Sequence, residues 1–156
     1  MYQIEKTVLV FHSAEAMFHL VNDIKQYPSF LPWCQSADIV SQEDRVLVAT
    51  LGLSYLGIKQ SFTTRNTNEV GRSIHFELVS GLFKQLDGYW LFTPLGEDGC
   101  KVQFKQTYSF NNGLLEKTIV PVFSKIADNL VDAFVKEADK RAQAHLRQIS
   151  LKSESA

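Results

Sequence analysis

The stretch from residue 37 to residue 110 most constrains the fold, because apolar and polar residues alternate through most of it. The pattern is cleanest near its end, where Val102, Phe104, Tyr108 and Phe110 share one face of an extended segment. Residues with a period of two lie on one face of a strand, so this pattern indicates strands that bury one face and expose the other to water.

Turn residues divide this stretch into about six strands. Glu43-Asp44 separates residues 37–42 from residues 46–55, Leu56-Gly57 precedes the next strand, and Gly71 marks a later turn. Strands joined by such short connections are typical of an antiparallel meander.

A further strand and a short helix precede the meander. Residues 2–11 alternate and become apolar on both faces near their end, which indicates a strand. Ser13 is suited to cap the N-terminus of a helix, with Glu15 in its first turn. The helix has one apolar stripe, made of Met17, Leu20, Val21 and Ile24.

A long helix is expected after Asn111-Asn112-Gly113, extending to about Ile149. Pro121 marks either its start or a kink within it. One apolar stripe contains Ile119, Val122, Phe123, Ile126, Leu130, Ala133 and Phe134, and a second contains Val131, Val135, Ala138, Ala142, Leu146 and Ile149. The second stripe fits either a homodimer or packing within the chain, and we favour packing on the first helix, whose apolar stripe needs cover.

This order of elements predicts an α+β fold in which a curved antiparallel sheet wraps around the long C-terminal helix. The length of 156 residues favours one domain. We expect that domain to comprise residues 1–150 and to be followed by a disordered tail at residues 151–156.

Composition and charge exclude several classes of protein. The net charge of −1 argues against a DNA-binding protein, which normally has a basic excess. A local positive stretch at residues 136–152 is read first as a solvated helix face. Cys34 and Cys100 are expected to be reduced thiols. Without a signal sequence or a membrane-spanning run, the chain is expected to be cytoplasmic, with at most peripheral membrane contact.

The sequence offers no catalytic or metal-binding pattern. Its histidines, His12, His19, His75 and His145, lack the spacing of metal ligands, and no nucleotide-binding or nucleophile motif occurs. Arg65, Glu77 and Asp87 are expected at the surface. An enzyme would need an acid or base inside a pocket, and no convincing candidate is found.

The irregular segment Tyr27–Cys34, YPSFLPWC, holds three aromatic residues and two prolines. A spacing of three would place Tyr27, Phe30 and Trp33 on one side of a 3₁₀ turn, opened by Pro28 and closed by Pro32. This segment forms either the rigid lip of an apolar pocket or plain packing of helix against sheet. The eleven phenylalanines likewise fit either a dense core or a cavity.

Three segments carry a resemblance to a known family. They are YPSFLPWC at 27–34, FTTRN at 62–66 and LVSGLFKQLDGYWLFTPL at 78–95. From about residue 3 to residue 148 the chain resembles the coenzyme Q-binding START-like proteins, whose bacterial branch includes the RatA-type ribosome-association toxins. Leu82 stands where the family often has proline, which affects the local turn.

The resemblance implies a helix-grip fold, also called START-like or Bet v 1-like, around a hydrophobic tunnel. It implies a non-enzymatic protein that binds ubiquinone or a related polyprenyl lipid and supports respiration. The alternative is a toxin that binds the large (50S) ribosomal subunit and blocks 70S association. The wider superfamily also contains polyketide cyclases, so an enzyme remains a third, less favoured hypothesis.

The candidate ligand-binding residues are all apolar. We expect the long helix to contribute Ile119, Phe123, Ile126, Leu130 and Phe134, the mouth of the pocket to contain Phe30, Leu31, Trp33, Phe83 and Leu86, and the sheet to add Phe62, Phe76 and Trp90. No catalytic residue, metal ligand or cofactor is predicted, with ubiquinone entering only as a possible bound ligand.

Overall fold

The computed structural model describes residues 1–111 and 113–155, so Asn112, in the predicted break before the long helix, and Ala156 lie outside it. The described residues form seven strands, two short helices, a single 3₁₀ turn and one long helix. The elements are β1 (Tyr2–Val10), α1 (Ala14–Asn22), η1 (Ile24–Gln26), α2 (Tyr27–Phe30), β2 (Cys34–Glu43), β3 (Val46–Tyr55), β4 (Ile58–Glu69), β5 (Ser73–Gly81), β6 (Gln85–Pro94), β7 (Cys100–Ser109) and α3 (Gly113–Ser155).

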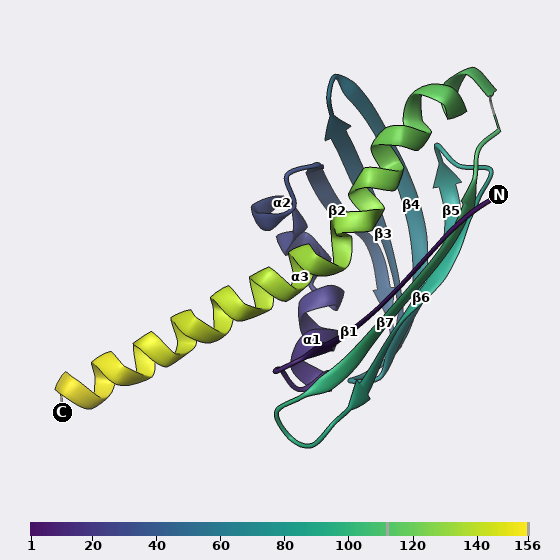
Figure 1. The fold of residues 1–156 in the computed structure, drawn as a ribbon. Helices are drawn as coiled ribbons and strands as arrows, with labels where there is room; N and C mark the ends of the chain where they lie inside the picture. Colours follow the sequence, from purple (N-terminus) through teal and green to yellow (C-terminus); the bar gives the residue numbers. More distant parts are fainter. Residues whose placement is uncertain (112, 156) are drawn as a thin grey trace.

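All seven strands belong to one antiparallel sheet, in the order β1-β7-β6-β5-β4-β3-β2. Strands β2 to β7 form the predicted meander, and β1 pairs with β7 at one edge. The sheet curves around the first part of α3, and α1 and α2 lie beside the middle of that helix (Figure 1). The predicted α+β helix-grip fold is confirmed.

The turns and caps follow the local sequence. The Ser13 hydroxyl accepts a hydrogen bond from the Ala16 backbone N–H at 3.1 Å, which confirms the predicted N-cap of α1. Asp44 and Leu56 have φ values of 55° and 48°, so both predicted hairpin turns contain left-handed residues. Strand β2 begins at Cys34, three residues before the predicted start.

The predicted 3₁₀ turn across Tyr27–Trp33 is wrong. The 3₁₀ turn lies earlier, at Ile24–Gln26, and Tyr27–Phe30 forms one turn of α-helix. Pro28 lies in the first turn of α2, where a missing N–H costs no intrahelical hydrogen bond, so it is compatible with α2.

Helix α3 is longer than the sequence pattern predicts. It begins at Gly113, eight residues before Pro121, and continues to Ser155, so residues 151–155 are helical where a disordered tail was expected. At 1.5 Å per residue its 43 residues span about 65 Å. Within the described chain, no helix combines enough length and apolar character to cross a bilayer.

The second half of α3 extends beyond the sheet (Figure 1). In the second predicted stripe Val131 and Ala138 are buried, in agreement with packing inside the molecule. Leu146 and Ile149, at the end of the same stripe, are 64% and 51% exposed. Packing within the chain therefore accounts for the first part of this stripe only.

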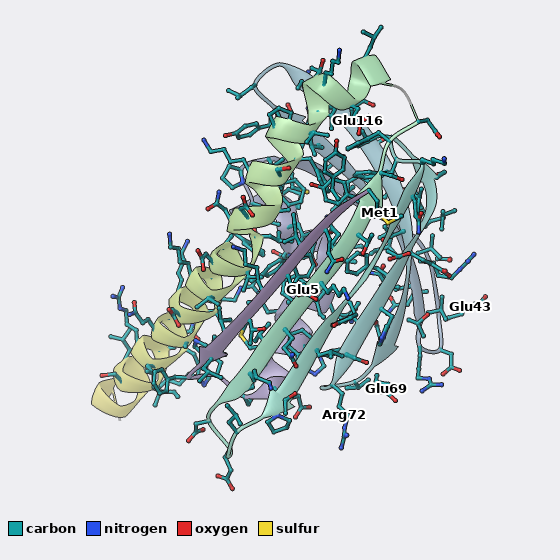
Figure 2. The ribbon with its side chains drawn as sticks, turned by 45° about the vertical axis from the view of Figure 1, so that its right-hand side comes forward. Met1, Glu5, Glu43, Glu69, Arg72 and Glu116 are labelled. Carbon is teal, nitrogen blue, oxygen red and sulfur yellow. The ribbon has the colours of Figure 1, made fainter. Side chains whose placement is uncertain are left out.

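Two contacts fix α3 against β1 and the start of α1. The Tyr2 hydroxyl donates to Glu116 Oε1 at 2.6 Å, which joins the start of β1 to the first turns of α3, and this carboxylate raises the pKa of Tyr2. Glu116 lies on the first turns of α3 (Figure 2). The His12 ring lies 2.6 Å from Asp139 Oδ1 at the opposite end of β1. The helix is thus held at two positions more than twenty residues apart.

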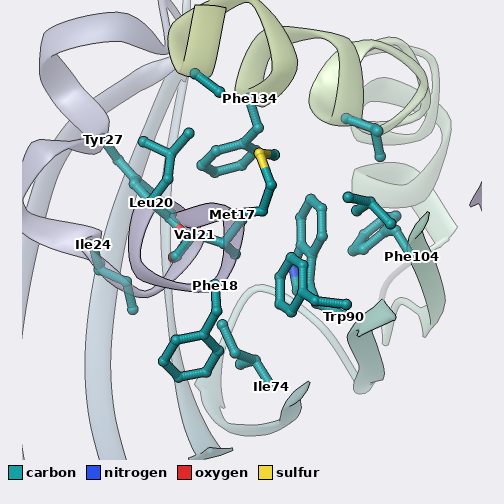
Figure 3. Packing of buried hydrophobic residues seen from close by; sticks show 14 of the residues in the cluster. Met17, Phe18, Leu20, Val21, Ile24, Tyr27, Ile74, Trp90, Phe104 and Phe134 are labelled. Atoms are coloured by element: carbon teal, nitrogen blue, oxygen red, sulfur yellow. Dashed lines mark hydrogen bonds between the residues drawn. The ribbon is translucent and has the colours of Figure 1, made fainter. Parts of the chain in front are cut away.

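The core has two parts along α3. One part lies between α1, α2, the sheet and the middle of α3, and its central rings are Phe18, Trp90, Phe104 and Phe134 (Figure 3). The other lies under the first turns of α3, around Phe83.

Gly88 allows the sheet to be packed closely at its centre. A Cβ atom at this position would lie 2.1 Å from the Lys105 carbonyl oxygen and 2.6 Å from Cζ of Phe76. The Phe76 ring therefore covers a bare stretch of β6 backbone, and no side chain fits beneath it.

We expect Gly88→Ala to lower the free energy of unfolding by about 1–3 kcal/mol, because the new methyl group overpacks a well-filled site. Urea unfolding followed by circular dichroism measures this change. Gly113→Ala is the matched control, since its Cβ would meet open space. Equal stability of the two variants would contradict the close packing of Phe76 on Gly88.

Candidate functional site

An apolar cavity of about 100 Å³ lies between α3 and the inner face of the sheet. Strands β3 to β7 supply its floor, the middle of α3 supplies its roof, and the end of α1 with the following turns closes one side. An apolar cavity of roughly 150 Å³ binds benzene in another protein. Entry of a larger substituted ring therefore requires side chains of the roof or the side wall to move.

Nine of the thirteen candidate residues line this cavity. They come from the turn after α2, from the three strands β4, β5 and β6, and from α3, and they are Trp33, Phe62, Phe76, Leu86, Trp90, Phe123, Ile126, Leu130 and Phe134. The alternation of the strands and the apolar stripe of α3 are what bring them together.

The other four candidates do not line the cavity. Leu31, Phe83 and Ile119 are only 1%, 2% and 1% exposed and belong to the packed core. Phe83 is surrounded by other rings, including those of Phe110 and Phe123 at 5.1 and 5.0 Å, which places it beyond the end of the cavity. Phe30 lies outside, against the outer side of α3. Phe30, Leu31 and Phe83, expected at the mouth, and Ile119, expected on the helix side, thus lie outside this cavity, and the contact of any of the thirteen residues with a ligand stays a prediction.

The three aromatic residues of YPSFLPWC do not share one side. Tyr27 and Trp33 line the cavity, whereas Phe30 packs edge-on against Phe134 at 5.4 Å and lies under Arg141. The Tyr27 hydroxyl donates to the Val21 carbonyl oxygen, and burial raises its pKa. The segment therefore has two rings at the cavity and one ring packed against α3, and its role as a rigid pocket lip stays a prediction.

Among the described residues, none that lines the cavity is charged. Thr64, Asn66 and Gln106 introduce the polar atoms of the floor, and the Thr64 hydroxyl donates to Asn66 Oδ1 at 2.9 Å. Asn66 and Gln106 are 8% and 7% exposed. The arrangement can hold a neutral molecule, and it contains no carboxylate, imidazole or amine for acid–base chemistry.

The sequence interpretation missed these polar residues, although a signal was present. Gln106 is the one polar residue among the inward positions of β7, between Phe104 and Tyr108. Asn66 and Asn68 take corresponding inward positions in β4. Polar residues at positions that should be apolar were the signal.

The two cysteines and the possible metal ligands form no catalytic site among the described residues. Cys34 and Cys100 are buried free thiols, and burial raises the pKa of Cys34 to about 11 and that of Cys100 in the same direction. Both are therefore protonated at neutral pH and weakly nucleophilic. In the part of the chain that the structure describes, no three His, Cys, Asp or Glu side chains gather where a metal ion could be held.

Comparison with known proteins agrees with this architecture. Residues 10–135 match the family model of polyketide cyclase / dehydrase and lipid transport proteins. A START superfamily protein from Mycobacterium smegmatis has the same fold, with a TM-score of 0.77, 20% identity and coverage of 90% of this chain and 99% of that one. The Zhui aromatase/cyclase from Streptomyces sp. R1128 gives a TM-score of 0.80 at 15% identity, with 90% and 95% coverage. At such identities these two structures establish the fold alone.

Two sequence relatives are more informative. The ribosome association toxin RatA of Vibrio cholerae serotype O1 is 41% identical over 138 residues, which cover 88% of this chain and 96% of the relative. The mitochondrial coenzyme Q-binding protein COQ10 of Drosophila melanogaster is 26% identical over 88% of this chain and 58% of that protein. The chain belongs to the polyketide cyclase / dehydrase and lipid transport family, within the group of sequences that includes the RatA proteins.

Proposed function

We propose that this protein acts on the ribosome as a RatA-type toxin, binding the large (50S) subunit and blocking formation of 70S particles. The observation that carries the proposal is the 41% identity to a ribosome association toxin across almost the whole length of both chains. The sequence predicted this function as the alternative to lipid binding, and the similarity to the RatA protein favours it over lipid binding.

The exposed end of α3 carries positive residues that suit contact with RNA phosphates. Residues 140–152 contain Lys140, Arg141, Arg147 and Lys152 and no acidic residue, in a protein whose net charge is only −1. Lys140 and Arg147 are exposed, and this part of the helix extends away from the sheet (Figure 1). We call residues 140–152 the arm. Its cations can replace counterions along a phosphate backbone.

We expect the double variant Lys140→Glu/Arg147→Glu to bind ribosomes about tenfold more weakly than the wild-type protein at ~0.1 M salt, because it loses two phosphate contacts. The measurement is co-sedimentation with 50S subunits, together with sucrose-gradient profiles of 30S, 50S and 70S particles. Wild-type protein in excess should lower the 70S peak, and the variant should restore it.

A matched control is Lys59→Glu/Lys84→Glu, which makes the same charge change at two exposed lysines of the sheet and its turns. This control should bind as the wild type does. Normal 70S formation at excess wild-type protein would contradict the ribosomal function, and equal losses in both double variants would contradict the role of the arm.

We propose as a second function that the cavity binds an uncharged apolar molecule, ubiquinone or a related isoprenoid lipid, without chemical conversion. The cavity itself supports this proposal, because its lining is apolar apart from a few amide and hydroxyl groups. The relative named as a coenzyme Q-binding protein and the family's connection with lipid transport point the same way. Neither function requires the protein to leave the cytoplasm, and lipid exchange needs only peripheral contact with a membrane.

We expect a short-chain ubiquinone to bind saturably and to quench the fluorescence of Trp33 and Trp90, which both line the cavity. Ala127→Leu should weaken this binding at least tenfold, because the added atoms fill space at the cavity wall. Ala144→Leu, at an exposed position of the same helix, is the control and should bind normally. Mass spectrometry of an organic extract of the purified protein identifies any lipid that co-purifies with it. An empty extract together with no saturable quenching would exclude the lipid-binding function.

A further inference from the structure

Gln106 is a polar residue in the core, and its side-chain N–H₂ group forms no hydrogen bond with the described residues. The residue is 7% exposed, and its Nε2 atom is buried. A buried donor left unpaired destabilises a protein, whereas an apolar side chain of similar shape does not. The amide is thus an unfavourable choice for the inner face of β7, where the neighbouring inward residues are Phe104 and Tyr108.

The sheet register places this amide on the floor of the cavity. Gln106 pairs with Gly88 on β6, Gly88 pairs with Phe76 on β5, and Phe76 pairs with Asn66 on β4. Directly paired residues point to the same face of a sheet, so these four form one row across the floor. Since Gly88 has no side chain and the Phe76 ring covers it, the row presents an amide, an aromatic ring and a second amide.

The two amides differ in their freedom. Oδ1 of Asn66 already accepts a hydrogen bond from Thr64 at 2.9 Å, which fixes the orientation of that amide. The Gln106 N–H₂ group has no such partner among the described residues, and Gln106 lines the same cavity. It is therefore a donor held in an apolar space beside an aromatic ring.

We propose that Gln106 determines ligand specificity by donating a hydrogen bond from Nε2 to a carbonyl oxygen of an uncharged ring molecule that lies against Phe76. This inference rests on the proposed use of the cavity as a site for an apolar ligand, and it defines the class of that ligand. Because the lining that the structure describes contains no charged residue, anionic and cationic ligands find no counter-charge in it. A neutral ring with a carbonyl group pairs the buried donor, and a plain hydrocarbon leaves it unpaired.

Two probes with the same carbon skeleton test this assignment. Tetramethyl-1,4-benzoquinone carries the carbonyl acceptors, and 1,2,4,5-tetramethylbenzene lacks them. We expect the wild-type protein to bind the quinone more tightly than the hydrocarbon in a fluorescence or calorimetric titration. Gln106→Leu should bind the quinone about tenfold more weakly and should bind the hydrocarbon as well as the wild type does.

The variants also separate recognition from folding. We expect Gln106→Leu to have an unchanged or higher unfolding temperature, because it removes an unpaired buried donor. Gln106→Met, which keeps the length of the side chain, should give the same two affinities. Gln103→Leu, at an outward position of the same strand, is the control and should bind both probes normally.

Other outcomes would overturn the assignment in distinguishable ways. Equal losses for both probes would mean that Gln106 only supports the shape of the cavity. Unchanged quinone binding in both Gln106 variants would mean that the amide does not contact the ligand and has a buried water as its partner. In these cases the cavity still binds ligands, whereas wild-type protein that binds neither probe would remove the proposed lipid-binding function together with this inference.

Discussion

The contact of the Phe134 ring with three other rings holds the parts of this molecule together. The centre of the Phe134 ring lies 5.3 Å from that of Tyr27, 5.4 Å from that of Phe30 and 5.3 Å from that of Trp90, in edge-to-face arrangements. Figure 3 shows Phe134 with Tyr27 and Trp90. Phe134 belongs to α3, Trp90 to the centre of the sheet, and the other two rings to α2. Burial of a phenylalanine side chain contributes about 1.5–3 kcal/mol, and aromatic pairs add to it. Helix α3, the sheet and α2 are therefore packed around the side chain of Phe134, which also lines the cavity.

The strands and the long helix could be predicted from sequence because their periodicities are strong and local. The cap at Ser13 and the turn at Asp44 likewise depend on neighbouring residues alone. The conformation of Tyr27–Phe30 could not be obtained in this way, since a spacing of three fits both a 3₁₀ turn and one turn of α-helix. Packing of Tyr27 and Phe30 against Phe134, more than one hundred residues away, accompanies the α-helical form.

The candidate site was predictable to the extent that it is apolar. Inward-facing residues of the strands and of the α3 stripe could be identified, but periodicity does not reveal where packing ends and empty space begins. Phe83 and Phe123 illustrate the limit, because they are in contact at 5.0 Å and only Phe123 reaches the cavity. Gln106 shows the opposite case. Its departure from the apolar pattern was visible in the sequence, and in the structure it places an unpaired amide in the lining of the cavity. Local violations of the folding pattern are expected at functional positions.

The two proposed functions use different parts of the same helix. The middle of α3 forms the roof of the cavity, and its exposed end carries the positive residues. A cavity of about 100 Å³ is too small for a substituted quinone unless its walls move. The floor is a hydrogen-bonded sheet with Phe76 packed against Gly88, so it resists displacement. The roof is held by side-chain contacts of α3 and by the two polar links at Tyr2 and His12. The roof and the exposed end are parts of one continuous helix, so a ligand could couple the cavity to that end only if it bound more tightly to one position of α3 than to another.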